Sequence, residues 1–109
     1  MNLKEIILKY ISIFNKQDTD DLKLLFDKKI RLQDWEINVK GIKKVINANK
    51  NIFKSTPTLK VKIEKIYCIK KTAICILNIR VNKKKFIKVV DIIDVNDKNK
   101  IISIRAYKG

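Results

Sequence analysis

The sequence predicts an α+β fold, in which a curved antiparallel sheet packs against three N-terminal helices around a pocket. Two features of the sequence predict this fold. Before Pro57, apolar residues recur mostly with the helical period of 3.6, and after it they recur with the strand period of 2. One short strand pattern interrupts the helical part. A bent sheet packed on helices leaves a conical pocket wherever the helices do not fill it.

The first helix is predicted from an apolar stripe with Tyr10 near its centre, formed by Leu3, Ile6, Ile7, Tyr10, Ile11 and Phe14. Residues 15–18 interrupt this stripe. Asp18 or Thr19 then caps a short second helix, because either side chain can accept a backbone N–H. The second helix carries Leu22, Leu25 and Phe26.

Residues 30–34 form the predicted first strand, in which Ile30, Leu32 and Asp34 point to one face. Gly41 opens the third helix, which ends before Pro57 because the residue ahead of a proline disfavours helical angles. The inner face of this helix is apolar apart from one amide and contains Ile42, Val45, Ile46, Asn49, Ile52 and Phe53.

Four strands follow, at residues 58–69, 72–81, 86–95 and 101–107. In the first of these the apolar phase slips between Ile63 and Ile66, which indicates a β-bulge. The second is apolar on both faces, which is more than the one-sided sheet of a monomer requires. We therefore expect a homodimer that forms through the outer face of the sheet.

The length of 109 residues fits one domain, residues 1–109. The net charge of +15 raises the question of a nucleic-acid partner. Only three of the 26 basic residues are arginines, and the lysines are scattered along the chain, whereas recognition of bases and phosphates favours the arginine fork. No specific nucleic-acid partner is therefore expected.

No apolar run approaches the ~20 residues that span a bilayer, and the N-terminal residues lack the features of a signal peptide. Cys68 and Cys75 lie in apolar strand patterns, which favours reduced core residues over a disulfide. We expect a cytoplasmic protein with no membrane partner. The sequence has no metal-ligand cluster and no glycine-rich phosphate loop, so no cofactor is expected.

Two carboxylates interrupt apolar strand faces. Asp34 ends the first strand on its apolar side, and Asp91 lies between Val89 and Ile93. An ionised carboxylate is costly to bury without a partner, so burial raises the pKa and favours the neutral acid, which is a hydrogen-bond donor. One ionised acid, one neutral acid and the phenol of Tyr10 at an apolar pocket would form a proton-transfer site.

Each of these residues also has a structural explanation when it is taken alone. Tyr10 can belong to the core, with its hydroxyl at solvent or at a backbone carbonyl, and Asp34 can cap or turn the end of the strand. Asn49 fits a position on the helix face at the rim of the pocket, and Trp35 fits packing or an interface. The combination of residues points to a site.

From Tyr10 to Tyr107 the chain resembles the NTF2-like superfamily, in its SnoaL-like and ketosteroid isomerase group. Three stretches carry the resemblance: KYISIFNKQDTDDLKLLFDKKIRLQDWE, VKGIKKVI and VVDIIDVNDKNKIISIRAYKG. It implies the cone-shaped NTF2-like fold. It says less about activity, because this superfamily hosts isomerases, cyclases, dehydratases, epoxide hydrolases and non-enzymes on one scaffold.

The resemblance to ketosteroid isomerases implies catalytic roles for three residues. Tyr10 falls where these enzymes carry the tyrosine of the oxyanion hole, and Asp34 falls where they carry the general base. Asp91 falls where they carry a protonated aspartic acid, the second donor of the oxyanion hole.

The chain also departs from those enzymes. Phe14, Asn49 and Trp35 are expected to line the pocket, but Ala48 and Asn49 stand where ketosteroid isomerases tend to have aromatic residues, and Glu36 adds a charge nearby. These differences indicate a more polar and smaller pocket, which does not suit a steroid. The absence of histidine excludes a His–Asp dehydratase mechanism, and no Asp-Arg-Asp arrangement like that of the epoxide hydrolases is present.

Two hypotheses follow. In the first, the protein is a small enzyme of the isomerase or cyclase type that acts on an enolisable carbonyl compound, which is a small ligand of apolar or mixed polarity. In the second, the protein is a non-catalytic ligand-binding or dimeric interaction domain. Convergence of the two acids and the phenol on an open pocket would support the first hypothesis, and a filled cavity would support the second.

Overall fold

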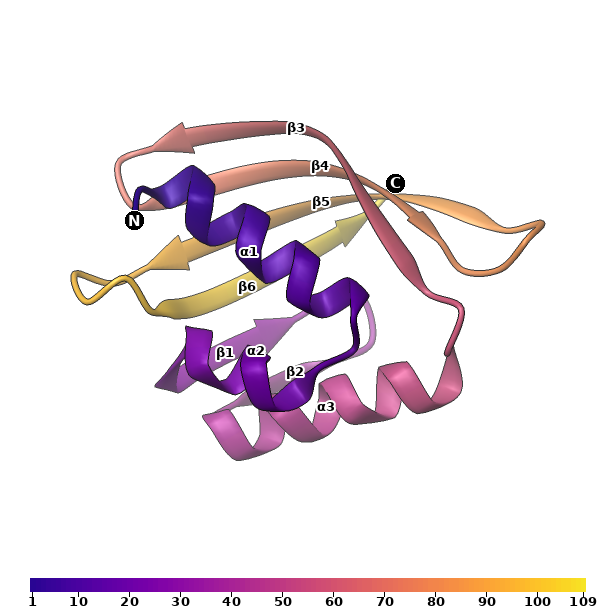
Figure 1. Cartoon of the computed structure of the whole chain (residues 1–109), viewed down its shortest axis with the longest axis horizontal. Helices are drawn as coiled ribbons and strands as arrows, with labels where there is room; N and C mark the ends of the chain where they lie inside the picture. Colours follow the sequence, from indigo (N-terminus) through magenta and orange to yellow (C-terminus); the bar gives the residue numbers. More distant parts are fainter.

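The computed structural model describes residues 1–109, which form three helices and one six-stranded sheet (Figure 1). In chain order the elements are α1 (Leu3–Asn15), α2 (Thr19–Leu25), β1 (Phe26–Gln33), β2 (Asn38–Lys40), α3 (Ile42–Ser55), β3 (Lys60–Ile69), β4 (Thr72–Arg80), β5 (Phe86–Val95) and β6 (Ile101–Lys108). The strand order is β2-β1-β6-β5-β4-β3. β1 runs parallel to β6, and every other neighbouring pair is antiparallel. The predicted α+β class and curved sheet are confirmed, but the sheet is not wholly antiparallel as predicted, because β1 lies parallel to β6.

The sheet curls around the helices, so one of its faces is buried and the other is open (Figure 1). α1 packs against β3 and β4, whereas α3 packs against β1 and β2. Cys75, Leu77 and Ile93 are buried toward the helices, while Ile76 and Ile92 alternate with them and are half-buried on the outer face. The sequence predicts that residues 72–81, which contain β4, are apolar on both faces. The second of these faces is therefore an outer surface of the chain.

Side-chain hydrogen bonds fix both ends of α1. At the N-terminus Asn2 and Glu5 form a capping box, in which Asn2 Oδ1 accepts the Glu5 N–H at 2.9 Å. At the other end the side chain of Asn15 hydrogen-bonds to the backbone of β3, as a neighbouring strand would. Its Nδ2 donates to the carbonyl of Val61, and its Oδ1 accepts the N–H of Val61, both at 2.8 Å. This pair of hydrogen bonds holds α1, which carries Tyr10, against β3.

The second helix is shorter, and the first strand longer, than the sequence predicts. Asp18 caps the helix, because its Oδ1 accepts the N–H of Asp21 at 3.0 Å. The helix ends at Leu25, and Phe26, which was expected on the helix, has an extended backbone and opens β1. Phe26 pairs with Ile101 of β6, so a long-range strand pairing overrides a local helical pattern.

The sequence does not predict β2, because three residues are too few to show strand alternation. Gly41 follows this strand with a φ of 95°, in the region that glycine adopts without strain. α3 then runs to Ser55 and ends before Pro57, as predicted. None of the three helices has the length and apolarity needed to cross a membrane.

The bulge predicted within residues 58–69 is confirmed, because the register between β3 and β4 shifts between Ile63 and Lys65. Both cysteines are free. Cys75 is buried, but Cys68, also expected in the core, is exposed. β3 is one of the two edge strands of the sheet, so Cys68 has a strand neighbour on one side only.

Candidate active site

The bent sheet and the helices enclose a pocket of about 890 Å³, and 18 of its 28 lining residues are hydrophobic. This volume lies toward the upper end of the ~300–1,000 Å³ that is usual for ligand pockets, so the pocket is larger than the sequence suggests. All six residues that the sequence singles out line it: Tyr10, Phe14, Asp34, Trp35, Asn49 and Asp91.

Tyr10 reaches the pocket from α1, at the centre of its apolar stripe. Its ring packs against the rings of Phe14 and Phe26, with centroid distances of 6.1 Å in both cases. Burial raises the pKa of the Tyr10 hydroxyl far above its ordinary value, and the neighbouring Asp91 and Cys75 raise it further. The hydroxyl therefore keeps its proton and acts as a hydrogen-bond donor.

Asp91 lies in the middle of β5 on the inner face of the sheet, opposite Cys75 of β4 and Ala106 of β6. Only 7% of the residue is exposed, and no basic side chain forms an ion pair with it. Burial, and to a smaller extent the charge of Asp34, raises the pKa of Asp91 from 3.8 to about 7. A large fraction of Asp91 is therefore protonated near neutral pH and can donate a hydrogen bond.

Asp34 directly follows β1, in the turn that leads to β2. Its Oδ1 accepts the backbone N–H of Glu36 at 2.7 Å and that of Ile37 at 2.6 Å. The Asp34 N–H donates to the carbonyl of Ile37 at 2.8 Å. The turn thus holds one carboxylate oxygen and leaves Oδ2 without a protein partner. The two explanations for Asp34, a turn residue and a pocket residue, are compatible.

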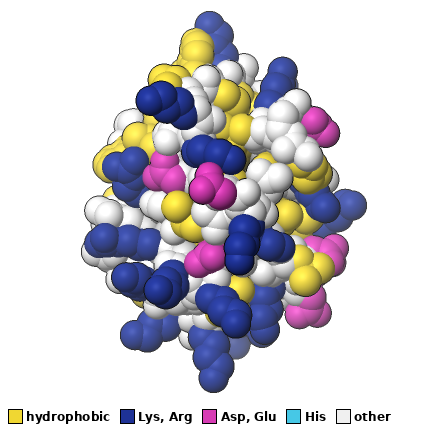
Figure 2. Space-filling view, turned by 90° about the vertical axis from the view of Figure 1, so that its left-hand side faces the viewer, with side chains coloured by type: hydrophobic (Ala, Val, Ile, Leu, Met, Phe, Trp, Pro, Cys, Tyr) yellow, Lys and Arg dark blue, Asp and Glu magenta, His cyan; other side chains and the backbone are white.

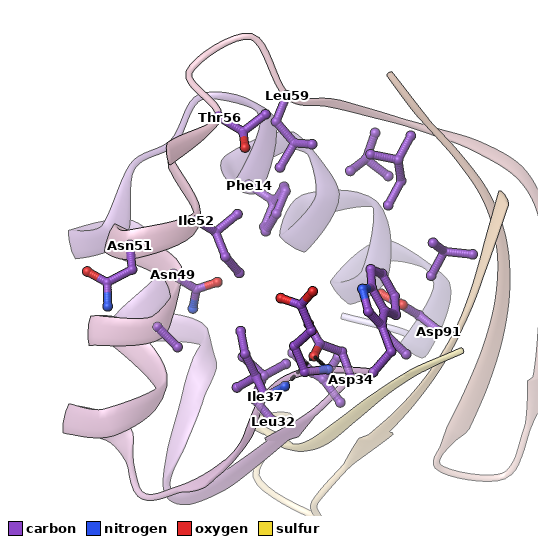
Figure 3. A pocket seen from close by; sticks show the side chains of 18 of the residues that line it. Phe14, Leu32, Asp34, Ile37, Asn49, Asn51, Ile52, Thr56, Leu59 and Asp91 are labelled. Carbon is purple, nitrogen blue, oxygen red and sulfur yellow. Dashed lines mark hydrogen bonds between the residues drawn. The ribbon is translucent and has the colours of Figure 1, made fainter. Parts of the chain in front are cut away.

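The Tyr10 hydroxyl and the Asp91 carboxyl also have no hydrogen-bond partner within the protein. Because no fully buried side-chain nitrogen or oxygen lacks a partner, these groups must be open to the pocket. Figure 3 shows Asp34 and Asp91 on the same side of the pocket, away from α3. The arrangement offers one acceptor oxygen and two donors to a ligand that enters the pocket.

The other three predicted pocket residues differ in their exposure. Asn49 is 3% exposed, so it is enclosed and does not lie at the rim. Phe14 is half-buried and meets Phe53 edge to face, with the ring centroids 4.9 Å apart. Trp35 is 45% exposed, and Nζ of Lys108 lies 5.6 Å from its ring centroid. Trp35 therefore belongs to the mouth of the pocket.

α3 and its C-terminal end add several polar residues to the pocket that the sequence pattern did not predict as pocket residues: Asn47, Asn51, Ser55 and Thr56. A signal was present, because residues 47–51 contain three asparagines within a helix, where asparagine is unfavourable. No group of three or more His, Cys, Asp or Glu side chains is placed to hold a metal ion.

No family model matches this sequence, and no curated protein matches it. Solved structures do match. An NTF2-like protein of unknown function from Cytophaga hutchinsonii has a TM-score of 0.85 and 14% identity, covering 100% of this chain and 91% of that chain. A protein from Kribbella flavida, provisionally named a ketosteroid isomerase, has a TM-score of 0.85 and 12% identity, covering 98% and 77%. A SnoaL-like protein of unknown function from Burkholderia thailandensis has a TM-score of 0.87 and 9% identity, covering 98% and 93%.

At such low identities, these matches establish the fold and leave the activity open. They cover 98% or more of this chain, so the likeness is not confined to a part of it. They also agree with the resemblance carried by the sequence between Tyr10 and Tyr107. The chain therefore has the NTF2-like fold.

Proposed function

We propose that the protein binds a small carbonyl compound and catalyses proton transfer at it, as an enzyme of the isomerase or cyclase type. One observation carries the proposal: polar groups without protein partners, on Tyr10, Asp34 and Asp91, line one mostly apolar pocket. An apolar pocket with a few convergent polar groups, one of them with a strongly perturbed pKa, is the usual form of a substrate site.

In the proposed reaction, Oδ2 of the ionised Asp34 takes a proton from the carbon next to the carbonyl. The electron pair of the broken C–H bond forms the C=C bond of an enolate, and the carbonyl π electrons move to the oxygen. Tyr10 and neutral Asp91 donate hydrogen bonds to this oxygen, where negative charge develops. Where the substrate carries a C=C bond in the β,γ position, the enolate is a dienolate, and Asp34 returns the proton to its γ-carbon. The C=C bond moves to the α,β position and the carbonyl re-forms, which completes an isomerisation. In a cyclase, the enolate carbon would instead attack a second carbonyl carbon of the same molecule. The π bond of that carbonyl breaks, and its oxygen takes the proton from Asp34, which restores the base.

Two observations support this division of roles. The Asp91 pKa of about 7 keeps a donor available up to neutral pH, and the two backbone N–H groups on Asp34 Oδ1 hold its carboxylate in one orientation. The structural match from Kribbella flavida, provisionally named a ketosteroid isomerase, is in keeping with the same class of chemistry. The alternative is a non-catalytic protein that binds a ligand in this pocket.

Deuterium exchange at the α-carbon of enolisable ketones, followed by NMR, tests the proposal. Asp34→Asn should fold and abolish the exchange, because it removes the base. Tyr10→Phe should slow the exchange by about 100-fold, the usual loss for one oxyanion-hole donor. Asp97→Asn removes a fully exposed carboxylate and is the matched control, with an unchanged rate. Equal exchange by the Asp34→Asn variant and the wild type would contradict the assignment.

We also propose that two copies of the chain associate through the outer face of the sheet. On that face Ile74 pairs with Ile92, and Ile76 pairs with Val90, across β4 and β5. All four are only half-buried within one chain. A contiguous apolar patch of this kind on a protein surface is typical of an interaction site.

A further inference from the structure

We propose that Asn49 determines specificity: its Oδ1 accepts a hydrogen bond from a hydroxyl or N–H group of the substrate, at a point remote from the reacting carbonyl. The substrate class is then a neutral, enolisable ketone that carries such a donor. This inference rests on the proposed function, because it concerns the same pocket.

The amide of Asn49 has a defined orientation. Its Nδ2 donates to the carbonyl of Val45, one turn earlier in α3, at 3.1 Å. The opposite orientation would put two acceptors, Oδ1 and the Val45 carbonyl, against each other. Oδ1 therefore faces away from Val45, and no protein group donates to it. Because no fully buried side-chain oxygen lacks a partner, the Oδ1 atom is open to the pocket.

An acceptor at this position is unexpected for packing alone. Asn49 and Asp91 are the only polar residues among the buried ones, and Asn49 occupies the inner face of α3 between the buried Val45 and Phe53. Asparagine is unfavourable in the middle of a helix, and its amide loses hydration when it is buried without a full set of partners. A leucine at this position would have a higher helix propensity and would fill the apolar core. Packing therefore does not explain the amide oxygen, and we assign it a role in binding.

The position of Asn49 indicates what the oxygen contacts. Figure 3 shows Asn49 on the α3 wall, across the pocket from Asp34 and Asp91. Apolar side chains, among them Leu32 and Ile52, line the pocket as well. A ligand that reaches both walls therefore has a carbonyl at one end, an apolar middle and a hydrogen-bond donor at the other end.

The charges around the pocket favour a neutral ligand. Its ionisable lining residues other than Tyr10 are three acids, Asp34, Glu36 and Asp91, and one base, Lys44. A carboxylate ligand would be repelled by the charge of Asp34, and an ammonium group would not reach Asn49 without losing its hydration in an apolar pocket. A hydroxyl or amide N–H satisfies Asn49 at lower cost.

The fluorescence of Trp35, the single tryptophan of the chain, reports binding because this residue lines the pocket. The probes are 2-decalone, a 2-decalone with a hydroxyl on the ring remote from the carbonyl, and the methyl ether of that hydroxyl. The methyl ether has the same oxygen without the donor hydrogen. Titrations in the Asp34→Asn background measure binding without turnover.

We expect the hydroxy ketone to bind at least tenfold more tightly than its methyl ether. Asn49→Leu should remove this preference and leave the affinity for 2-decalone within twofold. Asn49→Ala provides the same comparison if the leucine variant does not fold. Lys54→Leu, an equal polar-to-apolar change on the exposed side of α3, is the control and should keep the preference.

Equal or undetectable binding of the hydroxy ketone and its methyl ether would overturn the inference, as would a preference that persists in both Asn49 variants. Failure of this inference and failure of the proposed function are distinguishable. Deuterium exchange by the wild type without the hydroxyl preference would support the proposed function and contradict the role of Asn49. The hydroxyl preference without any exchange would support the role of Asn49 in binding and contradict catalysis.

Discussion

Asp91 links the stability of the protein to its proposed chemistry. Its pKa rises from 3.8 to about 7 on folding, so between these pH values the folded protein holds a proton that the unfolded chain has released. The free energy of unfolding therefore falls as the pH rises through this range. The stabilising contribution of the neutral acid is fully present below the unfolded pKa and is lost above the folded pKa. The change corresponds to roughly 4 kcal/mol, at about 1.36 kcal/mol per pH unit.

The Asp91→Asn variant tests this linkage. Asparagine keeps the shape of the side chain and an N–H donor, and it cannot ionise. Its free energy of unfolding should equal that of the wild type near pH 4 and exceed it by up to roughly 4 kcal/mol at pH 8. Urea unfolding at a series of pH values measures the difference, with Asp97→Asn as the control. A difference that does not change with pH would show that Asp91 is not the titrating group.

The positions of the site residues could be predicted because a carboxylate on an apolar strand face is a conspicuous pattern. Asp34, Asp91 and Asn49 all interrupt apolar faces, and all three line the pocket. The orientation of Asp34 could not be predicted. It depends on hydrogen bonds from Glu36 and Ile37, in a turn whose shape is set by the pairing of β1 with β2.

At the scale of elements, the contact between α1 and β3 depends on Asn15. The side chain occupies both hydrogen-bonding groups of Val61, a residue that is 8% exposed. Asn15→Ala leaves these groups unpaired and should lower the free energy of unfolding by about 1–3 kcal/mol. Asn15→Asp keeps the acceptor and loses the donor. Its free energy of unfolding should therefore lie between those of the alanine variant and the wild type.

Chemical denaturation measures these changes. Ser12→Ala, on the exposed side of α1, is the matched control and should alter stability by less than about 0.5 kcal/mol. If Asn15→Ala proves as stable as Ser12→Ala, the Asn15–Val61 hydrogen bonds do not hold α1 in place.

Long elements with a strong period were predictable to within a few residues. β5 begins at Phe86 and ends at Val95, as the sequence predicts, and α3 stops before Pro57. Short elements and junctions were not predictable, because their form is set by distant partners. Phe26 fits a helical pattern, but it pairs with β6. β2 lies at the edge of the sheet and pairs only with β1.

At the scale of the whole molecule, the proposed dimer predicts twice the chain mass by light scattering at micromolar concentration. Each copy carries a net charge of +15, so added salt should strengthen the association by screening repulsion. Ile92→Lys, in the outer face of the sheet, should give the mass of one chain. Leu24→Lys, at a residue of α2 that is 67% exposed, is the control and should leave the dimer intact. A wild-type mass of one chain under these conditions would rule out the proposed association.

The net charge of +15 comes from many lysines along the chain. Figure 2 shows lysine and arginine side chains over much of one face, most densely in the lower half of the view, with acidic and apolar side chains among them. Such a surface attracts polyanions through long-range electrostatics alone, without sequence preference and with strong salt dependence. The absence of a specific nucleic-acid partner stays a prediction.

The proposed function depends on a neutral Asp91 and a charged Asp34 on the same side of one pocket, and a carboxyl-carbon NMR titration tests this most directly. The Asp91 resonance is assigned by its loss in Asp91→Asn. We predict that it titrates with a pKa near 7 and that the pKa falls in Asp34→Asn, because the charge of Asp34 contributes to the shift. A pKa near the ordinary value of 3.8 would contradict the account. Asp91 would then be ionised at neutral pH, it would have no proton to donate to an enolate oxygen, and the non-catalytic alternative would take the place of the proposed enzyme.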